Sequence, residues 1–454
     1  MVLSDMDMAR RLAEAVDAAG GCAYFVGGYV RDLIMGDEGK DLDVEVHGLA
    51  PHRLKEILDS LGERLDIGEN FGIFGLRGYN IDIAMPRKEE CRGKGHRDFD
   101  VFVDPHIGTV GAAKRRDFTV NAMMQNILTG EIVDHYGGRE DLKRGIIRHV
   151  DEGTFAEDPL RALRGCQFAA RFGFTIAPET IELCRGMDIS TLPRERIMGE
   201  LEKALMKSDK PSVFFENLRE MGQLSIWFPE LEALIGIEQN PRYHSEGDVW
   251  VHTMMVLDQA AGIRKYATNP LGFMLSAIAH DFGKAICTEV INGEIHCYEH
   301  ETRGLHLVDR FIRRLTGEVE LRKYLLNMTE HHMKPNMLAA QSASVKSTNK
   351  LFDKSVDPEG LLCLAIADGL GKTSPREYIS YNEFFRERLD VYREYMSRPH
   401  VVGQDLIDAG LTPGKHFGDY LAYAHKLRLA GVEKSDALKQ TLGYARSKKA
   451  KNKY

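Results

Sequence analysis

The alternating segment DLDVEV, residues 41–46, constrains the fold of this chain more than any other stretch. Acidic and aliphatic residues alternate along it, and a period of two is typical of a β-strand with one buried face. Successive side chains on a strand point to opposite faces, so Asp41, Asp43 and Glu45 share one face. Aligned carboxylates repel one another unless a cation lies between them. The segment therefore predicts either a divalent-metal site or a solvated edge strand.

A glycine pair precedes this strand. The predicted strand AYFV ends at Gly27 and Gly28, and YVRDLIMG, which carries Arg31, reads as a helix. A glycine pair lets backbone N–H groups approach a phosphate closely, and the helix N-terminus adds a favourable dipole. We therefore expect the glycine pair to contribute to phosphate binding.

A third carboxylate lies on a later predicted strand. YNIDIAM places Asp82 beside the acidic strand if the two strands are neighbours in one sheet. Two acids on one strand and a third on the next suit two Mg²⁺ ions roughly 3.5–4 Å apart. One ion would activate an attacking hydroxyl, and the other would hold a triphosphate.

The segment KRRDFTVNAMMQ adds basic and polar groups. Arg115 and Arg116 provide guanidinium groups that match phosphate oxygens, and Asn121 could donate to a ribose.

Composition limits the remaining classes. A chain of 454 residues exceeds one hydrophobic core, so we expect two or more domains. The formal net charge of −8 gives no global basic footprint, so an RNA partner must be held by local basic patches. The seven cysteines are scattered without a CxxC pair, which favours a reducing, cytoplasmic location. No apolar run approaches ~18 residues, so no membrane span is expected.

The chain changes character near residue 150. Upstream, helix and strand patterns alternate, whereas downstream the patterns are almost entirely helical, with loops expected near NPRYHSEGD and INGEIHCYEHE. The predicted class is α+β, with a small mixed head followed by a helical neck, body and tail. The predicted divisions are residues 1–145, 146–225, 226–375 and 376–454.

The helical segment EDPLRALR is a candidate base reader. Asp158, Arg161 and Arg164 recur every three residues and share one helix face. A carboxylate only accepts hydrogen bonds and a guanidinium only donates them. Such a pair matches the amine donor and ring-nitrogen acceptor that cytosine and adenine share, and it rejects uracil and guanine. The alternative is a carboxylate at a helix N-terminus beside ordinary surface arginines.

Several of these segments, in this order, carry a resemblance to a known family. GGYVRD, DLD, RRDFTVNAM, EDPLRALRGCQFAARFGF and RERIMGELEKAL resemble motifs of the class II tRNA nucleotidyltransferases, within the DNA polymerase β superfamily. These are the CCA-adding enzymes and their bacterial poly(A) polymerase relatives. The resemblance implies a polymerase β-like head that adds CCA to the 3′ end of tRNA, with CTP and ATP as substrates and Mg²⁺ as cofactor.

The same resemblance assigns the site residues. It implies that Asp41 and Asp43 bind Mg²⁺ and are catalytic together with Asp82. The implied nucleotide-binding residues are Gly28, Arg31, Arg115, Arg116, Asp117, Asn121, Asp158, Arg161 and Arg164. The chain departs from the family pattern at Gln167, where an arginine is usual, and at the stretch 111–113 before the RRD step. A poly(A) polymerase and a partial, CC- or A-adding, enzyme stay open as alternatives.

The helical body contains a second set of candidate ligands. His252, His280, Asp281 and Asp368 lie in an order that resembles the HD phosphohydrolase superfamily, and His300 and His332 are secondary candidates. An HD domain also occurs in one subgroup of bacterial CCA-adding enzymes. The resemblance implies a second divalent metal and removal of phosphates, including 2′,3′-cyclic phosphates at RNA ends.

Two alternatives to a chain with both activities stay open. The HD domain could be degenerate and only support tRNA, or the protein could be an HD phosphohydrolase whose head is an RNA-binding module. No sequence feature predicts an oligomeric state.

Overall fold

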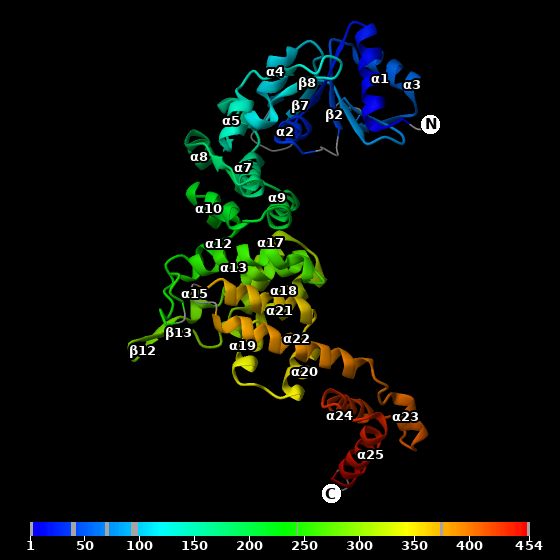
Figure 1. Ribbon diagram of the computed structural model, residues 1–454, viewed down its shortest axis with the longest axis vertical. Helices are drawn as coiled ribbons and strands as arrows, with labels where there is room; N and C mark the ends of the chain where they lie inside the picture. Colours follow the sequence, from blue (N-terminus) through cyan, green and yellow to red (C-terminus); the bar gives the residue numbers. More distant parts are fainter. Residues whose placement is uncertain are drawn as a thin grey trace. The chain divides into compact units, whose positions relative to one another are not determined.

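The chain folds into two compact units (Figure 1). The computed structural model describes residues 3–37, 42–68, 72–91, 99–242, 244–372 and 376–451. The first unit is Met1–Trp227 and the second is Phe228–Tyr454. The finer division into four domains stays a prediction. Among the helices that the structure describes, none combines the length and apolar composition that a membrane span requires.

A seven-stranded mixed sheet forms the centre of the head, with strand order β3-β4-β5-β2-β1-β8-β9. Strands β2 and β5 pair in parallel, whereas the other neighbours in this sheet pair antiparallel. The strands are β1 (Cys22–Val26), β2 (Leu42–His47), β3 (Arg64–Gly68), β4 (Ile73–Leu76), β5 (Ile81–Ala84), β8 (Met124–Asn126) and β9 (Ile132–Val133).

The two faces of β2 differ as the alternating sequence predicts. Leu42, Val44 and Val46 are buried on one face, where helix α1 contacts both β1 and β2. Asp43 is half-buried on the other face. The helices of the head are α1 (Asp5–Ala18), α2 (Gly28–Met35), α3 (Pro51–Leu61), α4 (Gly108–Lys114) and α5 (Gly138–Arg144). The predicted strand–glycine–helix order of β1 and α2 is therefore confirmed.

The rest of the first unit is helical and packs around α7. This helix, which carries the predicted base reader, contacts α9 and α10 and buries Leu163, Cys166 and Phe168. The helices are α6 (Glu152–Ala156), α7 (Leu160–Phe172), α8 (Pro178–Arg185), α9 (Arg194–Lys207), α10 (Ser212–Glu220) and α11 (Leu224–Trp227).

The second unit is built around three helices, α13, α14 and α21, that contact one another. The sequence of α14 is apolar on all sides and that of α21 is predominantly apolar, which is typical of buried helices. The helices are α12 (Pro229–Glu232), α13 (Val249–Ile263), α14 (Pro270–Ala279), α15 (Lys284–Cys287), α16 (His300–Arg303), α17 (Leu305–Leu315), α18 (Val319–His331), α19 (Met333–Ala340), α20 (Val345–Lys354), α21 (Pro358–Leu370), α22 (Arg376–Ser397), α23 (Gly403–Asp408), α24 (Phe417–Leu429) and α25 (Lys434–Lys451).

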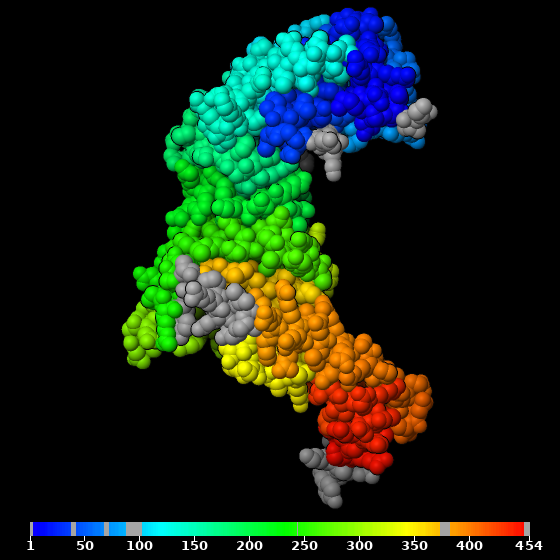
Figure 2. All heavy atoms as spheres, in the orientation of Figure 1, coloured from blue at the N-terminus to red at the C-terminus, as the bar shows by residue number. Residues whose placement is uncertain are grey.

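One predicted loop is a β-hairpin, so that prediction was wrong. Strands β12 (Glu289–Ile291) and β13 (Glu294–His296) pair antiparallel around Asn292 and Gly293, both of which have positive φ. An Asn-Gly pair between short strands is a strong hairpin signal. The hairpin projects from its surroundings in Figures 1 and 2, and Val290 on β12 is 69% exposed.

Two other short pairs of strands lie outside the main sheet. Strands β6 (Arg87–Cys91) and β7 (Phe99–Val103) pair antiparallel, and the residues between them lie outside the described part of the chain. Strands β10 (Ile146–Ile147) and β11 (Thr175–Ile176) pair in parallel beside α7. The α+β class is confirmed, although the helical part is not free of strands.

Gly138, the first residue of α5, gives a test of the head packing. A Cβ added there would lie 2.2 Å from the carbonyl oxygen of Thr119. We expect Gly138→Ala to lower the free energy of unfolding by about 1–3 kcal/mol, because the backbone must shift. Gly199→Ala in α9 is the matched control, since its Cβ meets nothing within 4 Å, and it should stabilise by roughly 0.5–1 kcal/mol. Thermal unfolding of both variants measures the difference, and equal midpoints would contradict the predicted clash.

Candidate active sites

A cleft of about 340 Å³ lies on the polar face of the head sheet. Asp43 on β2 and Asp82 on β5 both line it, and they are direct register partners across the parallel strand pair. The parallel pairing therefore sets the two carboxylates side by side, as carboxylate ligands of a hard cation require. Asp41 lies outside the described residues.

The turn between β1 and α2 follows Val26, which lines this cleft. Gly27 has a φ of +66°, which favours glycine. A Cβ at this position would lie 3.3 Å from Nη1 of Arg116 and 3.5 Å from Oδ2 of Asp43. The glycine therefore allows both charged side chains to approach the backbone.

Glu45 positions one of the predicted phosphate-binding arginines. Its carboxylate accepts from Arg116 at 3.1 Å and lies 2.8 Å from Nε2 of His47. Burial alone would raise the pKa of Glu45, but the contacts with His47 and Arg116 hold that pKa below its usual range. Glu45 therefore acts as an anchor for Arg116, although it shares the acidic face with Asp43.

A second cleft of about 640 Å³ shares Asp43, Arg115, Arg116 and Arg161 with the first. All the residues predicted to bind the nucleotide line it: Gly28, Arg31, Arg115, Arg116, Asp117, Asn121, Asp158, Arg161 and Arg164. The structure therefore brings together segments of the head and of α7 that lie far apart in the sequence.

Asp117 organises the floor of this second cleft. One oxygen accepts from the side chain of Asn121 at 3.1 Å, and the other accepts from Nε of Arg164 at 2.8 Å. Although burial opposes ionisation, Arg164 and Asn121 lower the pKa of Asp117. Asn121 in turn accepts from Arg31 at 2.6 Å. These bonds fix the two arginines, so Asp117 holds the site together rather than facing a ligand freely.

The predicted base-reading residues have defined partners. Asp158 accepts from Nη2 of Arg196 at 3.0 Å and from the backbone N–H of Leu160 at 3.1 Å. The guanidinium of Arg161 donates to the carbonyl oxygens of Thr154 and Arg115, each at 2.7 Å. Both side chains are therefore held in fixed orientations at the cleft.

Aromatic rings of α7 support the buried arginine of α2. The guanidinium of Arg31 lies over the ring of Phe172 at 4.6 Å and near that of Phe168 at 5.5 Å, and the Phe168 ring also contacts Arg164. Cation–π contacts of this kind stabilise a desolvated arginine. They fix the position of α7 relative to the glycine turn.

A cluster of buried histidines and aspartates lies in the second unit. Asp281 is central: Oδ2 lies 3.2 Å from Nε2 of His280, and Oδ1 lies 3.1 Å from His300 and 3.7 Å from His332. Nε2 of His252 lies 3.1 Å from Asp368 and 3.8 Å from Asp281. The predicted HD ligands and both secondary candidates therefore converge, and His252–His280–Asp281 and Asp281–His300–His332 each form a group that could hold a metal ion.

The tautomers of three of these histidines suit a metal. Nδ1 of His280, His300 and His332 each contacts a backbone carbonyl three residues earlier, at 2.7–2.9 Å. With the proton on Nδ1, the lone pair of Nε2 points toward the cluster. In the described part of the chain, Nε2 of His280 and Oδ2 of Asp281 are buried without a completed hydrogen bond. The donor set therefore fits a divalent cation.

The lack of a side chain at Gly283 allows the segment of Asp281 to contact the turn of His300. A Cβ at this position would lie 2.0 Å from the carbonyl oxygen of His300, and one at Gly304 would lie 2.5 Å from the Cα of Gly283. The chain after Asp281 can therefore contact the turn that carries His300 only if both positions are glycine.

A pocket of about 580 Å³ opens beside the cluster. Its lining includes Asp368 and His300 from the cluster, together with Lys284, Lys372 and His244. Nζ of Lys284 lies 2.7 Å from Asp281 and donates to Gln239 at 2.8 Å. The pocket thus combines candidate metal-ligand side chains with two ammonium groups, whose charge would suit an anionic ligand.

Comparison with known proteins decides the family. Residues 23–148 match the poly A polymerase head domain, and residues 173–235 match the probable RNA and SrmB-binding site of polymerase A. The multifunctional CCA protein of Pasteurella multocida is 37% identical over 402 residues, covering 85% of this chain and 91% of the relative. The chain belongs to the class II CCA-adding enzyme family. The relative in Actinobacillus pleuropneumoniae serotype 5b, also a multifunctional CCA protein, is 36% identical over 68% of this chain and 74% of its own.

Solved structures agree in fold. A CCA-adding enzyme of Thermotoga maritima, complexed with tRNA, matches with a TM-score of 0.65 and 20% identity over 97% of this chain and 95% of that chain. The CCA-adding enzyme of Bacillus stearothermophilus in complex with CTP matches with a TM-score of 0.66 and 20% identity over 99% of this chain and all of the other. The polymerase β-like head with a helical remainder is therefore confirmed.

Membership of the CCA-adding family also implies use of a divalent metal, and the described residues contain candidate groups for one.

Sequence reasoning did not assign roles to several residues at these sites. Glu45 and His47 share the strand of Asp43, and this alternation was the available signal. Arg196, Phe168 and Phe172 could be found only through the packing of α7 and α9.

The pKa values of the histidine cluster predict a pH dependence. Burial lowers the pKa of His300, but its contact with Asp281 outweighs burial and raises the pKa to about 10. Contacts with Asp368 and Glu246 likewise outweigh burial and raise the pKa of His252. A metal must displace these protons, so its affinity should rise with pH between 6 and 9, by about tenfold per unit for each proton displaced.

Isothermal titration of Mn²⁺ at pH 8, in buffers of different ionisation enthalpy, measures the protons released. The contribution of the cluster is the difference between the wild-type protein and the His280→Ala, Asp281→Ala variant. Release of no protons at pH 8 would contradict the prediction, because exposed histidines are already neutral at that pH.

Proposed function

We propose that this protein is a template-independent tRNA nucleotidyltransferase that adds CCA to tRNA 3′ ends with CTP and ATP. The observation that carries the proposal is the paired carboxylates Asp43 and Asp82 beside an arginine-lined cleft, in a chain 37% identical to a multifunctional CCA protein. Related proteins of the same fold bind tRNA, ATP or CTP, as their structures are described. The scattered cysteines without a CxxC pair and the kinship with CCA proteins support a cytoplasmic location, which we assign.

The head residues position the reacting groups. Asp41 and Asp43, with Asp82, are the proposed ligands of Mg²⁺, which when bound would neutralise charge on the triphosphate. Arg116, held by Glu45, and Arg115 contact phosphate oxygens of the incoming nucleotide. Attack by the tRNA 3′-hydroxyl on the α-phosphate then releases pyrophosphate, and catalysis rests on positioning and charge stabilisation.

Base choice is assigned to α7. Asp158 accepts from the exocyclic amine of cytosine or adenine, and Arg161 donates to the ring nitrogen. Arg196 holds the first of these side chains, and two backbone carbonyls hold the second. A rigid pair of this kind acts as a protein template, since a base with the reverse pattern would place a donor against the Arg161 donor and an acceptor against the Asp158 acceptor.

The poly(A) polymerase and partial-addition alternatives share the same head. Incorporation of two cytidines before an adenosine separates them from the proposed reaction. The name shared by the relatives, multifunctional CCA protein, favours complete CCA addition.

We assign a second activity, metal-dependent removal of phosphate from RNA ends or 2′,3′-cyclic nucleotides, to the histidine cluster. His252, His280, Asp281 and Asp368 are its proposed metal ligands, with His300 and His332 completing the set. A divalent cation there supplies a bound water of lowered pKa. Lys284 and Lys372 attract the phosphate. The complete and buried donor set argues against a degenerate domain.

Addition of nucleotides tests the first activity. A tRNA lacking its 3′ CCA, incubated separately with labelled CTP, ATP, UTP and GTP, should incorporate CTP first, and ATP only after CTP. Asp43→Asn should lower the rate by about 10³-fold, because charge stabilisation in the transition state is lost. Asp66→Asn on β3 is the matched control, since Asp66 pairs only with Arg64 in a described ion pair outside the cleft, and its rate should not change. Near-native incorporation by Asp43→Asn would reject the assignment.

A double substitution separates the two activities. His280→Ala with Asp281→Ala should abolish hydrolysis of a 2′,3′-cyclic nucleotide with Mg²⁺, Mn²⁺, Ni²⁺ or Co²⁺, because metal ligands act as a unit. CTP incorporation should be preserved, since none of these ligands lines the head clefts. The control is Asp353→Ala with His425→Ala, which removes an exposed pair of the same residue types. Wild-type protein inert with every metal would favour the degenerate domain.

A further inference from the structure

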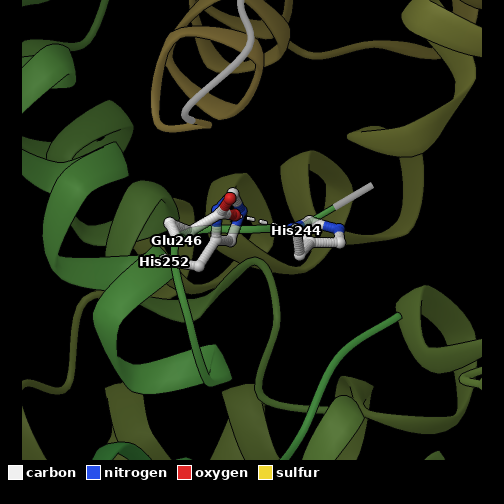
Figure 3. Close-up of side chains that lie close together, drawn as sticks. All are labelled: His244, Glu246 and His252. Atoms are coloured by element: carbon white, nitrogen blue, oxygen red, sulfur yellow. Dashed lines mark hydrogen bonds and ion pairs between the residues drawn. The ribbon is translucent and has the colours of Figure 1, made fainter. Parts of the chain in front are cut away.

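We infer that Glu246, which the sequence analysis does not name and which groups with His244 and His252 in the structure, is a positioning residue that orients His252 toward the metal centre and sets the metal affinity of that centre. The inference rests on the proposed metal centre in the second unit. Figure 3 shows the carboxylate of Glu246 between two imidazoles, those of His252 and His244. Oε1 lies 2.9 Å from Nδ1 of His252 and 2.8 Å from Nδ1 of His244.

The contact distinguishes His252 from the other histidines of the cluster. His280, His300 and His332 direct Nδ1 at neutral backbone carbonyls. Nδ1 of His252 instead lies at ion-pair distance from a carboxylate oxygen, without a completed hydrogen bond, while its Nε2 faces Asp368 and Asp281. The charge of a carboxylate behind a ligating imidazole orients that imidazole and raises its basicity as a ligand. His252 is therefore positioned to be the strongest imidazole donor of the centre.

Burial makes the carboxylate effective. The side chains of Glu246 and His252 are both fully enclosed, so water does not weaken their interaction. His244 lines the pocket and lies edge-on to His252, with ring centroids 4.8 Å apart. Because it binds the same oxygen of Glu246 from the pocket side, His244 shields the carboxylate from solvent.

The loop before α13 holds Glu246 in place. Gly247 has a φ of +135° and accepts from the side chain of Gln239 through its carbonyl oxygen. Asp248, the N-cap of α13, accepts from Val251 at 2.9 Å and from the backbone N–H of Gly236 at 2.6 Å. Hydrogen bonds at Gly247 and Asp248 restrain this loop, so it can hold the carboxylate of Glu246 in the defined position that a positioning role needs.

Titration of the full-length protein with Co²⁺ tests the inference, because the visible absorption of Co²⁺ reports its ligand geometry. The signal of the centre is the part that is absent from His280→Ala, Asp281→Ala. We expect Glu246→Gln to weaken Co²⁺ binding by about 10–100-fold and to change the absorption spectrum. Glu246→Asp, which keeps the charge, should recover part of the affinity. Glu238→Gln removes the same charge from the rim of the pocket and should leave both readouts unchanged.

Wild-type affinity and an unchanged spectrum in Glu246→Gln would overturn the inference and leave the proposed metal centre intact. Absence of the Co²⁺ signal from the wild-type protein would overturn both. If Glu246→Gln does not fold, His244→Ala takes its place, because it opens the carboxylate to water. That variant should weaken Co²⁺ binding severalfold, and unchanged binding would contradict the proposal. Thermal unfolding, which reports on both compact units, serves as the measure of intact protein in every variant.

Discussion

Electrostatic repulsion between neighbouring carboxylates is the constraint on which the head depends. The parallel pairing of β2 and β5 places Asp43 directly opposite Asp82, and like charges opposite each other on a sheet destabilise it. The surrounding structure compensates with positive charge: Arg116 reaches the same face, and the glycine turn allows it to approach Asp43. The same carboxylates and arginine that make this face electrostatically unfavourable alone would suit a cation and a triphosphate bound together.

The two proposed centres use different ligand chemistry. The head offers carboxylate oxygens on exposed or half-buried strand positions, which suit a hard cation that keeps several waters. The second unit offers mainly imidazole nitrogens in a buried cluster, which suit transition metals. One chain can therefore hold two kinds of metal, because oxygen and nitrogen donors are kept in separate compact units.

The sequence allowed many of the strands and helices that carry the candidate residues to be predicted. The strand of Asp43 follows from its period of two, and the helix of Arg161 from its composition, since both signals are local. The partners of these residues could not be predicted in the same way. Asp117 bonds to Arg164, and Glu246 contacts His252, only because the tertiary fold brings them together. The hairpin at Asn292 was missed although its turn signal is local, because the surrounding polar residues resembled a loop.

The contact between Gly283 and the backbone of His300 also bears on how the activity proposed for this domain could be lost during evolution. No atom of Gly283 is a ligand, yet any side chain at this position would push the turn of His300 away from Asp281. A descendant could therefore become inactive with all its histidines and aspartates in place. A survey that counts only ligand residues would classify such a protein as an active hydrolase. The residue at position 283 would show whether His300 can still approach Asp281.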